Sequence, residues 1–189
     1  MIKLFSFFFD RKGTSKESES KFRLIEGWDA YQEAVKLFTI KNPKERNDEQ
    51  ALLLFDKAID CGIKDAYSLR ALCLQGLDYH YDAIEDFDQA LLNEKNDPNL
   101  YFGRGHSKKI IADYDGAISD LKQAVELSKL PTKLNGEYND EIGKSGWQSA
   151  TQYFSFQLQD AIDRKEKTQS EALKELYLGM AKKIKRRPQ

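Results

Sequence analysis

The chain has 189 residues, with 30 basic and 31 acidic side chains and a formal net charge of −1. This balance gives no overall attraction to nucleic acid. Four prolines, 11 glycines and few β-branched runs argue against an all-β fold, and no segment approaches the ~20 apolar residues of a membrane span. The length is sufficient to bury the core of one helical domain.

Residues 1–21 are predicted to form an aromatic segment followed by a polar linker. The aromatic part contains Phe5, Phe8 and Phe9, but the apolar run is short for a signal peptide and lacks a small-residue cleavage site. Three alternatives remain open. The segment docks on its own domain, inserts shallowly into a membrane interface, or occupies a groove of a partner.

The next region, 22–62, is predicted to be a pair of helices with a long connection. Trp28, Tyr31 and Val35 have helical spacing, and a polar stretch with one proline separates them from the triplet Ala51, Phe55 and Ala58. Steps of four and three keep the three side chains of the triplet on one helical face. The small residues at its ends let a neighbouring helix approach closely.

The same triplet recurs twice in the middle of the chain. Its further copies are Ala83, Phe87 and Ala90, and Ala117, Leu121 and Ala124. Each of these copies follows a polar turn with an aromatic residue. The copies recur with a period in the low thirties, which is typical of stacked helical hairpins, and such stacks usually bind another molecule.

The segment 97–127 resembles a tetratricopeptide repeat (TPR). Asp97 and Pro98 lie between units, and six further positions match the spacing of the family: Tyr101, Gly105, Tyr114, Ala117, Leu121 and Ala124. Segment 64–94 also matches, apart from an irregularity near His80, so the resemblance is clearest over 64–127. It implies an all-α, right-handed superhelical stack of antiparallel hairpins, a TPR-like α-solenoid with about eight helices.

This resemblance organises the chain as one TPR-like domain, 22–187. It contains a degenerate repeat (22–62), two regular repeats (64–94 and 97–128), a loop (130–146) and an elongated C-terminal hairpin (147–187). In that hairpin Trp147 opens the first helix, and Ala172, Leu176 and Gly179 repeat the ridge. Either a fourth repeat or a plain capping hairpin accounts for it. The basic end is explained by the dipole of a last helix or by binding to an anionic membrane.

The resemblance also implies that the first helix of each pair lines a concave groove that holds a peptide segment. The groove positions that we expect are Ser68, Leu72, Gln75, Asn99, Phe102, His106, Lys109 and Ile110. Apolar anchors beside His106 and Lys109 suit a segment with some acidic character. Arg104 and Lys108, one turn apart, favour the same kind of ligand, unless Arg104 packs between helices.

Catalytic chemistry has no support in the sequence. The two histidines, His80 and His106, have no ligand spacing to each other or to either cysteine, and no glycine-rich phosphate loop is present. Pairs of acidic residues are spaced as one exposed helical face. We therefore expect no enzyme, no metal and no cofactor.

The predicted function is that of a cytoplasmic, non-catalytic adaptor or scaffold that binds a segment of another protein in the groove, without nucleic acid. Two alternatives stay open. One is a bacterial immunity-type protein that neutralises a toxin by covering its active site. The other is a membrane-peripheral scaffold that uses the phenylalanine-rich N-terminus.

Overall fold

The structure is a computed structural model that describes residues 16–40, 47–130, 146–168, 171–181 and 187. These residues contain eight helices and no strand, which confirms the predicted all-α class. The helices are α1 (Lys16–Phe38), α2 (Asp48–Asp60), α3 (Ala66–Gly76), α4 (His80–Asn93), α5 (Pro98–Ile110), α6 (Tyr114–Ser128), α8 (Ala150–Lys167) and α9 (Glu171–Ala181).

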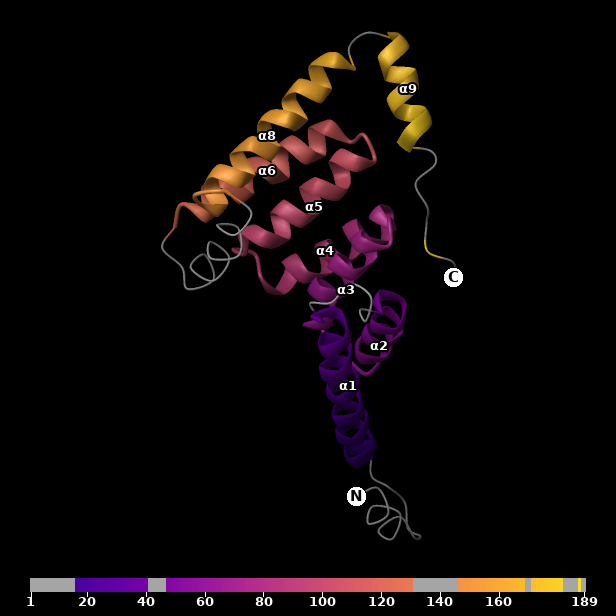
Figure 1. Ribbon diagram of the computed structural model, residues 1–189. Coiled ribbons are helices and arrows are strands. Elements are labelled where there is room, and N and C mark those ends of the chain that lie inside the picture. The colour runs from indigo at the N-terminus through magenta and orange to yellow at the C-terminus, as the bar shows by residue number, and fades with distance from the viewer. Residues whose placement is uncertain (1–15, 41–46, 131–145, 169–170, 182–186, 188–189) are drawn as a thin grey trace.

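The helices stack as consecutive antiparallel hairpins (Figure 1). α1 packs on α2, α3 on α4 and α5 on α6, and the second helix of each hairpin also packs on the helix that follows it. α6 is in this way covered by α8. Each unit contacts its neighbours along the chain, which is the arrangement of an α-solenoid.

The three small-large-small triplets form the centre of the core. They lie on α2, α4 and α6, and every member is buried: Ala51, Phe55, Ala58, Ala83, Phe87, Ala90, Ala117, Leu121 and Ala124. Because steps of four and three place the members on one face, each triplet forms a continuous apolar ridge. The alanines at its ends let the neighbouring helices approach closely, as the spacing predicts.

Two equivalent turns connect the helices of the middle hairpins. Asp78 and Ala112 occupy the same position in successive repeats, and both have φ of 63°. Each ends its helix with the same pair of bonds: Tyr79 N–H donates to Leu74 O and Asp78 N–H to Gln75 O after α3, and Asp113 and Ala112 repeat the pattern after α5. This is a Schellman motif, whose left-handed position glycine usually occupies.

Gly103 sets the distance between α4 and α5. A β-carbon there would overlap the ring of Phe87, which is itself buried. Only a glycine permits this approach. The buried Phe87 ring thus packs against α5 and forms part of the wall of the candidate site.

The sequence predicts a polar linker up to residue 21, but the structure is already helical from Lys16. Lys21 pairs with Glu17 at 2.8 Å, one turn away, and Lys and Glu are good helix formers. None of the residues 16–26 is buried, so this part of α1 extends beyond the core, and the first buried residue is Gly27. In Figure 1 it projects away from the stack.

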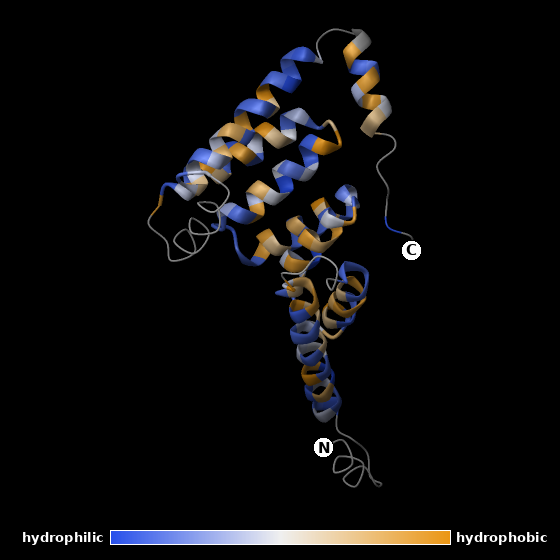
Figure 2. Cartoon of the chain, in the orientation of Figure 1, coloured by the Kyte–Doolittle hydropathy of each residue, from blue (hydrophilic) through white to orange (hydrophobic). Residues whose placement is uncertain are grey.

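The ridge expected from Ala172, Leu176 and Gly179 does not pack at its last two positions. α9 stands apart from α8 in Figure 1, Leu176 is exposed, and nothing lies within 4 Å of a β-carbon placed on Gly179. Hydrophobic residues nevertheless run along α9 (Figure 2). The spacing correctly indicates an apolar helical face, but it does not say which helix covers that face. The helix expected from Trp147 begins at Ala150, where Ser149 caps it.

Candidate functional site

A hollow of about 390 Å³ lies over the first helices of the two middle hairpins. Six of the eight predicted groove residues line it, namely Ser68, Leu72, Gln75, Asn99, Phe102 and His106. They are brought together because steps of three and four place each set on one face of α3 or α5. The other lining residues are Leu69, Phe87, Asp97, Leu100, Gly103 and Tyr153.

Aromatic rings build the apolar side of the hollow. The Phe102 ring stacks on Phe154, with 4.6 Å between centroids, and contacts Tyr153 at 5.3 Å. Phe154 is fully buried, so it fixes Phe102 from behind. Leu72 is 40% exposed on the facing helix. An apolar side chain that entered the hollow would be covered from both sides.

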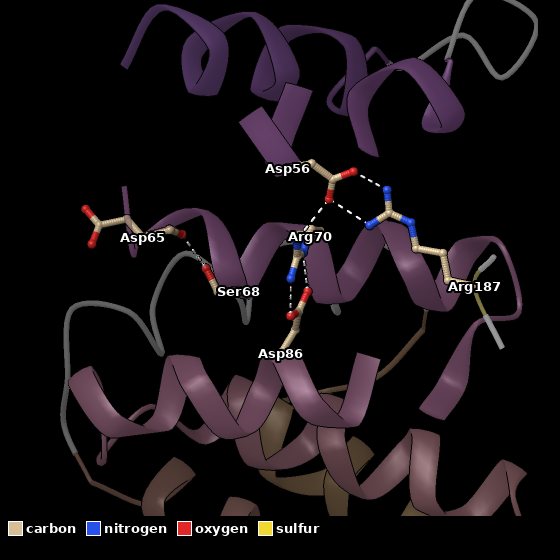
Figure 3. A network of polar contacts seen from close by, with 6 residues as sticks. All are labelled: Asp56, Asp65, Ser68, Arg70, Asp86 and Arg187. Atoms are coloured by element: carbon tan, nitrogen blue, oxygen red, sulfur yellow. Dashed lines mark hydrogen bonds and ion pairs between the residues drawn. The ribbon is translucent and has the colours of Figure 1, made fainter. Parts of the chain in front are cut away.

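The polar groups of the hollow differ in their availability. The Gln75 amide is already used inside the protein, because its Nε2 donates to Gly103 O and Ser107 Oγ of α5, both at 2.7 Å. Ser68 Oγ donates to the carbonyl of Asp65 at 3.1 Å (Figure 3). Asn99 Oδ1, in contrast, is buried and accepts no hydrogen bond from the part of the chain that the structure describes. A buried acceptor without a donor is destabilising until a donor reaches it.

His106 is neutral at physiological pH. Its pKa is lowered to about 4, mainly by burial and also by the nearby charges of Lys109, His80 and Arg164, against the opposing Asp160. A neutral imidazole both donates and accepts one hydrogen bond. His106 therefore contributes a polar ring to the hollow without a charge.

Lys109 and Ile110 lie outside the hollow. The Lys109 side chain is 5% exposed, and its ammonium donates to Gln157 Oε1 at 2.6 Å and Asp160 Oδ2 at 2.8 Å on α8. Its charge is thus compensated inside the protein. The ammonium joins α5 to α8, as Gln75, at the equivalent position one repeat earlier, joins α3 to α5.

Arg104 packs between helices, which is the second of the two alternatives. Its guanidinium forms two bonds to Asp120 on α6, at 2.7 and 2.9 Å, and one to Asp88 on α4 at 2.5 Å. Lys108 also pairs with Asp120, at 2.8 Å. Neither cation is without a carboxylate partner. The expected preference for an acidic ligand therefore has no support from these two side chains.

One repeat earlier, Arg70 makes the corresponding contacts. It bonds twice to Asp86 on α4, at 2.6 Å, and once to Asp56 on α2 at 2.8 Å (Figure 3). Arg70 and Asp86 have the same separation in the sequence as Arg104 and Asp120. The sequence contains this repeated Arg–Asp spacing, but our interpretation of the sequence missed it. Tyr153 was also missed, because nothing local indicates that α8 reaches the hollow.

A larger hollow, of about 490 Å³, lies between the α5–α6 turn, the end of α8 and α9. Its lining includes Tyr114, Tyr177, Lys174 and the ion pair of Lys165 with Asp115. None of the predicted site residues reaches it. We therefore base the candidate site on the smaller hollow.

Phe5, Phe8 and Phe9 lie outside the described residues. None of the helices that the structure describes is long and apolar enough to cross a membrane. Within the same residues, no group of three or more His, Cys, Asp or Glu side chains is placed to hold a metal ion.

Comparison with known proteins identifies the fold. The chain is similar to PcrH from Pseudomonas aeruginosa, with a TM-score of 0.50 to its crystal structure and 16% sequence identity. The similarity covers 80% of this chain and 96% of that chain. No protein-family model matches the sequence, and no curated protein matches it. The likeness supports the predicted TPR-like α-solenoid and, at this identity, extends to the fold alone.

Proposed function

We propose that this protein is a non-catalytic interaction module that binds a segment of another protein in the hollow between α3 and α5. The observation that carries the proposal is the hollow itself, which six expected groove residues line on the first helices of adjacent hairpins. It combines fixed aromatic rings with an exposed leucine and an unsatisfied acceptor. Apolar anchors in pockets with a few polar groups are typical of peptide recognition.

The contacts favour an apolar anchor over a charged one. His106 is neutral, and the Lys109 charge is held by Asp160 away from the hollow. Phe102, Tyr153 and Leu72 offer contact area to an aliphatic or aromatic side chain. An N–H of the bound segment would satisfy Asn99 Oδ1. We therefore expect affinity to depend on one apolar side chain and on hydrogen bonds, with a weak dependence on salt.

Leu72→Glu tests the proposal. Leu72 is 40% exposed, so the charge has access to water in the free protein but would be desolvated beneath a bound segment. Leu53→Glu on α2 is the matched control, because Leu53 is 65% exposed and does not line the hollow. Both variants should keep the far-UV circular dichroism of the original chain.

The readout is affinity purification with quantitative mass spectrometry from the native cell. A bound partner should be lost, by at least about tenfold, from Leu72→Glu and retained by Leu53→Glu, since a buried unpaired charge costs several kcal/mol. A photo-crosslinker at position 72 should then label a segment of that partner with an apolar residue at the crosslink. Equal recovery on both variants would contradict binding in the hollow.

A further inference from the structure

Arg187, near the C-terminus, is bound by the first two hairpins (Figure 3). Its guanidinium bonds to both carboxylate oxygens of Asp56 on α2, the Nη1–Oδ1 pair at 2.7 Å. Its backbone N–H donates to Asp82 Oδ2 on α4 at 2.9 Å. One residue thus makes a side-chain contact and a backbone contact to two helices that lie far from it in the sequence. We call the place that it occupies the acidic notch, formed by Asp56, Asp82 and Asp86.

The acidic notch has more negative than positive charge without Arg187. Among the residues that the structure describes, the guanidinium of Arg70 binds Asp56 and Asp86, so the three carboxylates of the notch are set against one cation. A second cation is therefore attracted to the place that Arg187 holds. The attraction is stronger than at an open surface, since the side chains of Arg187 and Asp56 are both only 24% exposed.

The geometry selects arginine among cations. A planar guanidinium binds both oxygens of one carboxylate through two parallel N–H groups, whereas an ammonium is a single point charge. Arg187 uses this two-bond arrangement on Asp56 while its backbone N–H is held by Asp82. The notch thus recognises the guanidinium of an arginine. By holding the backbone N–H of the same residue, it also sets the direction of the chain there.

The notch is not a simple by-product of the repeated ion pairs. One repeat later, Asp88 and Asp120 correspond to Asp56 and Asp86, but Gly116 stands where Asp82 would be. The carboxylate that accepts the backbone N–H is present only in the first of the two places. Arg70 also lies two positions from both Ser68 and Leu72 on α3, on the opposite face of that helix from the hollow.

We propose that the acidic notch is a recognition site for an arginine within a basic segment of a partner protein, and that Arg187 occupies it in cis in the free chain. A partner segment then competes with the C-terminal end of the protein for Asp56 and Asp82. This second interaction surface is independent of the hollow and goes beyond the proposed function.

Peptide binding tests the notch without altering it. The probe is a fluorescein-labelled peptide of residues 182–189, and the receptor is the full chain carrying Arg187→Ala, which leaves the notch vacant. Binding is measured by fluorescence anisotropy at about 0.15 M salt, where interactions between separated surface charges are screened. Replacing the arginine of the peptide at position 187 by lysine should weaken binding at least about fivefold, and by alanine at least about tenfold. The unaltered chain should bind the original peptide at least about fivefold more weakly than the Arg187→Ala chain.

Asp82→Asn in the Arg187→Ala chain tests the second contact. It removes one carboxylate charge and leaves the Arg70 pairs intact, so peptide affinity should fall at least about threefold. The matched control is Asp88→Asn in the same chain, since Asp88 occupies the equivalent place to Asp56 in the next repeat. That control should retain peptide affinity.

Two results would overturn the proposal. Equal affinity for the arginine, lysine and alanine peptides would show nonspecific attraction to negative charge. Equal affinity of the unaltered and Arg187→Ala chains would show that Arg187 does not occupy the notch in solution.

Discussion

The two middle hairpins and the last helices use similar residues to different effect. In the middle, Arg70 and Arg104 form two-bond pairs with Asp86 and Asp120, whose side chains are each 6% exposed. Towards the C-terminus, Lys165 and Asp115 pair where their side chains are 44% and 82% exposed. The arginine pairs therefore hold adjacent helices at a defined register in the middle, whereas the Lys165–Asp115 pair is solvated and contributes little.

The apolar residues show the same contrast. The triplets on α4 and α6 are buried, whereas α9 carries an equally regular pattern with exposed Leu173, Leu176 and Met180. Periodicity alone thus does not decide whether a helical face is covered. The candidate site lies where the regular part meets the irregular part, because Phe102 of α5 contacts Tyr153 of α8 there.

The largest effect on the free energy of unfolding is expected when the buried Arg70–Asp86 pair is broken. Arg70→Met should lower the free energy of unfolding by about 3 kcal/mol, because it leaves the buried Asp86 carboxylate without its two-bond partner. Lys165→Met should change it by about 0.5 kcal/mol or less, since its pair is exposed. Urea unfolding near neutral pH measures both. Similar effects of the two substitutions would remove the distinction between the middle and the end.

The pH dependence of stability tests how closely α5 and α8 pack around His106. The pKa of His106 is lowered to about 4 in the folded chain, by burial and by Lys109, His80 and Arg164, against the opposing Asp160. The unfolded chain binds this proton from about pH 6.5 downward, so the contribution is complete above that pH and is lost as the pH falls.

From about pH 7 to about pH 5, the unaltered chain should lose about 2 kcal/mol more unfolding free energy than His106→Gln. The other titrating groups are shared by both chains, so they cancel in this difference. Chemical unfolding at the two pH values gives the result. Parallel pH profiles would mean that His106 is already solvated at the boundary.

A pair of glycines probes packing in the two regions. Gly103→Ala should destabilise by about 1–2 kcal/mol, because the clash with Phe87 exceeds the helix propensity gained. Gly179→Ala should stabilise α9 by up to about 1 kcal/mol, since nothing lies within 4 Å of the new β-carbon. Thermal unfolding compares the signs. A destabilising Gly179→Ala would indicate that α9 is packed after all.

The smallest expected effect concerns the repeated turns. Ala112 has φ of 63°, which a β-carbon disfavours, so Ala112→Gly should stabilise by about 0.5–1 kcal/mol net of the greater freedom of the unfolded chain. The reciprocal Ala58→Gly on the buried part of α2 should destabilise. Melting temperatures of both variants check the prediction, and a lower melting temperature for Ala112→Gly would contradict it.

The stacked hairpins were predictable because their signals are local. Ala83, Phe87 and Ala90 lie on one face of one helix, and their recurrence as Ala117, Leu121 and Ala124 fixes the repeat. The positions around the hollow followed from the resemblance to the TPR family, and Ser68 and Phe102 are equivalent in the two repeats. Local spacing and a repeat length suffice for the stack, whereas the groove also needed the geometry that the family implies.

The remainder depends on contacts that no local pattern specifies. Lys109 has the spacing of a groove residue, but the carboxylate that neutralises it, Asp160, comes from a later helix that lies outside the two regular repeats. Arg187 and Asp56 are separated by most of the chain. Pairings at such separation are visible only once the chain is folded, so sequence reasoning overestimated the charge of the groove and overlooked the acidic notch.

The exposed first part of α1 has a consequence for local stability. Residues 16–26 form about three helical turns with no buried side chain, and a helix of that length is marginal in water by itself. These turns continue from the packed part that begins at Gly27, and Arg23 and Glu26 also bond to Asp60 and Lys57 of α2. Because no side chain there is buried, we expect their backbone hydrogen bonds to open more often than those beside Ala30 and Ala34. Stability against local opening should therefore decrease along the described part of α1 from Gly27 towards Lys16, and the exposed Phe22 and Ile25 lie in the less protected part.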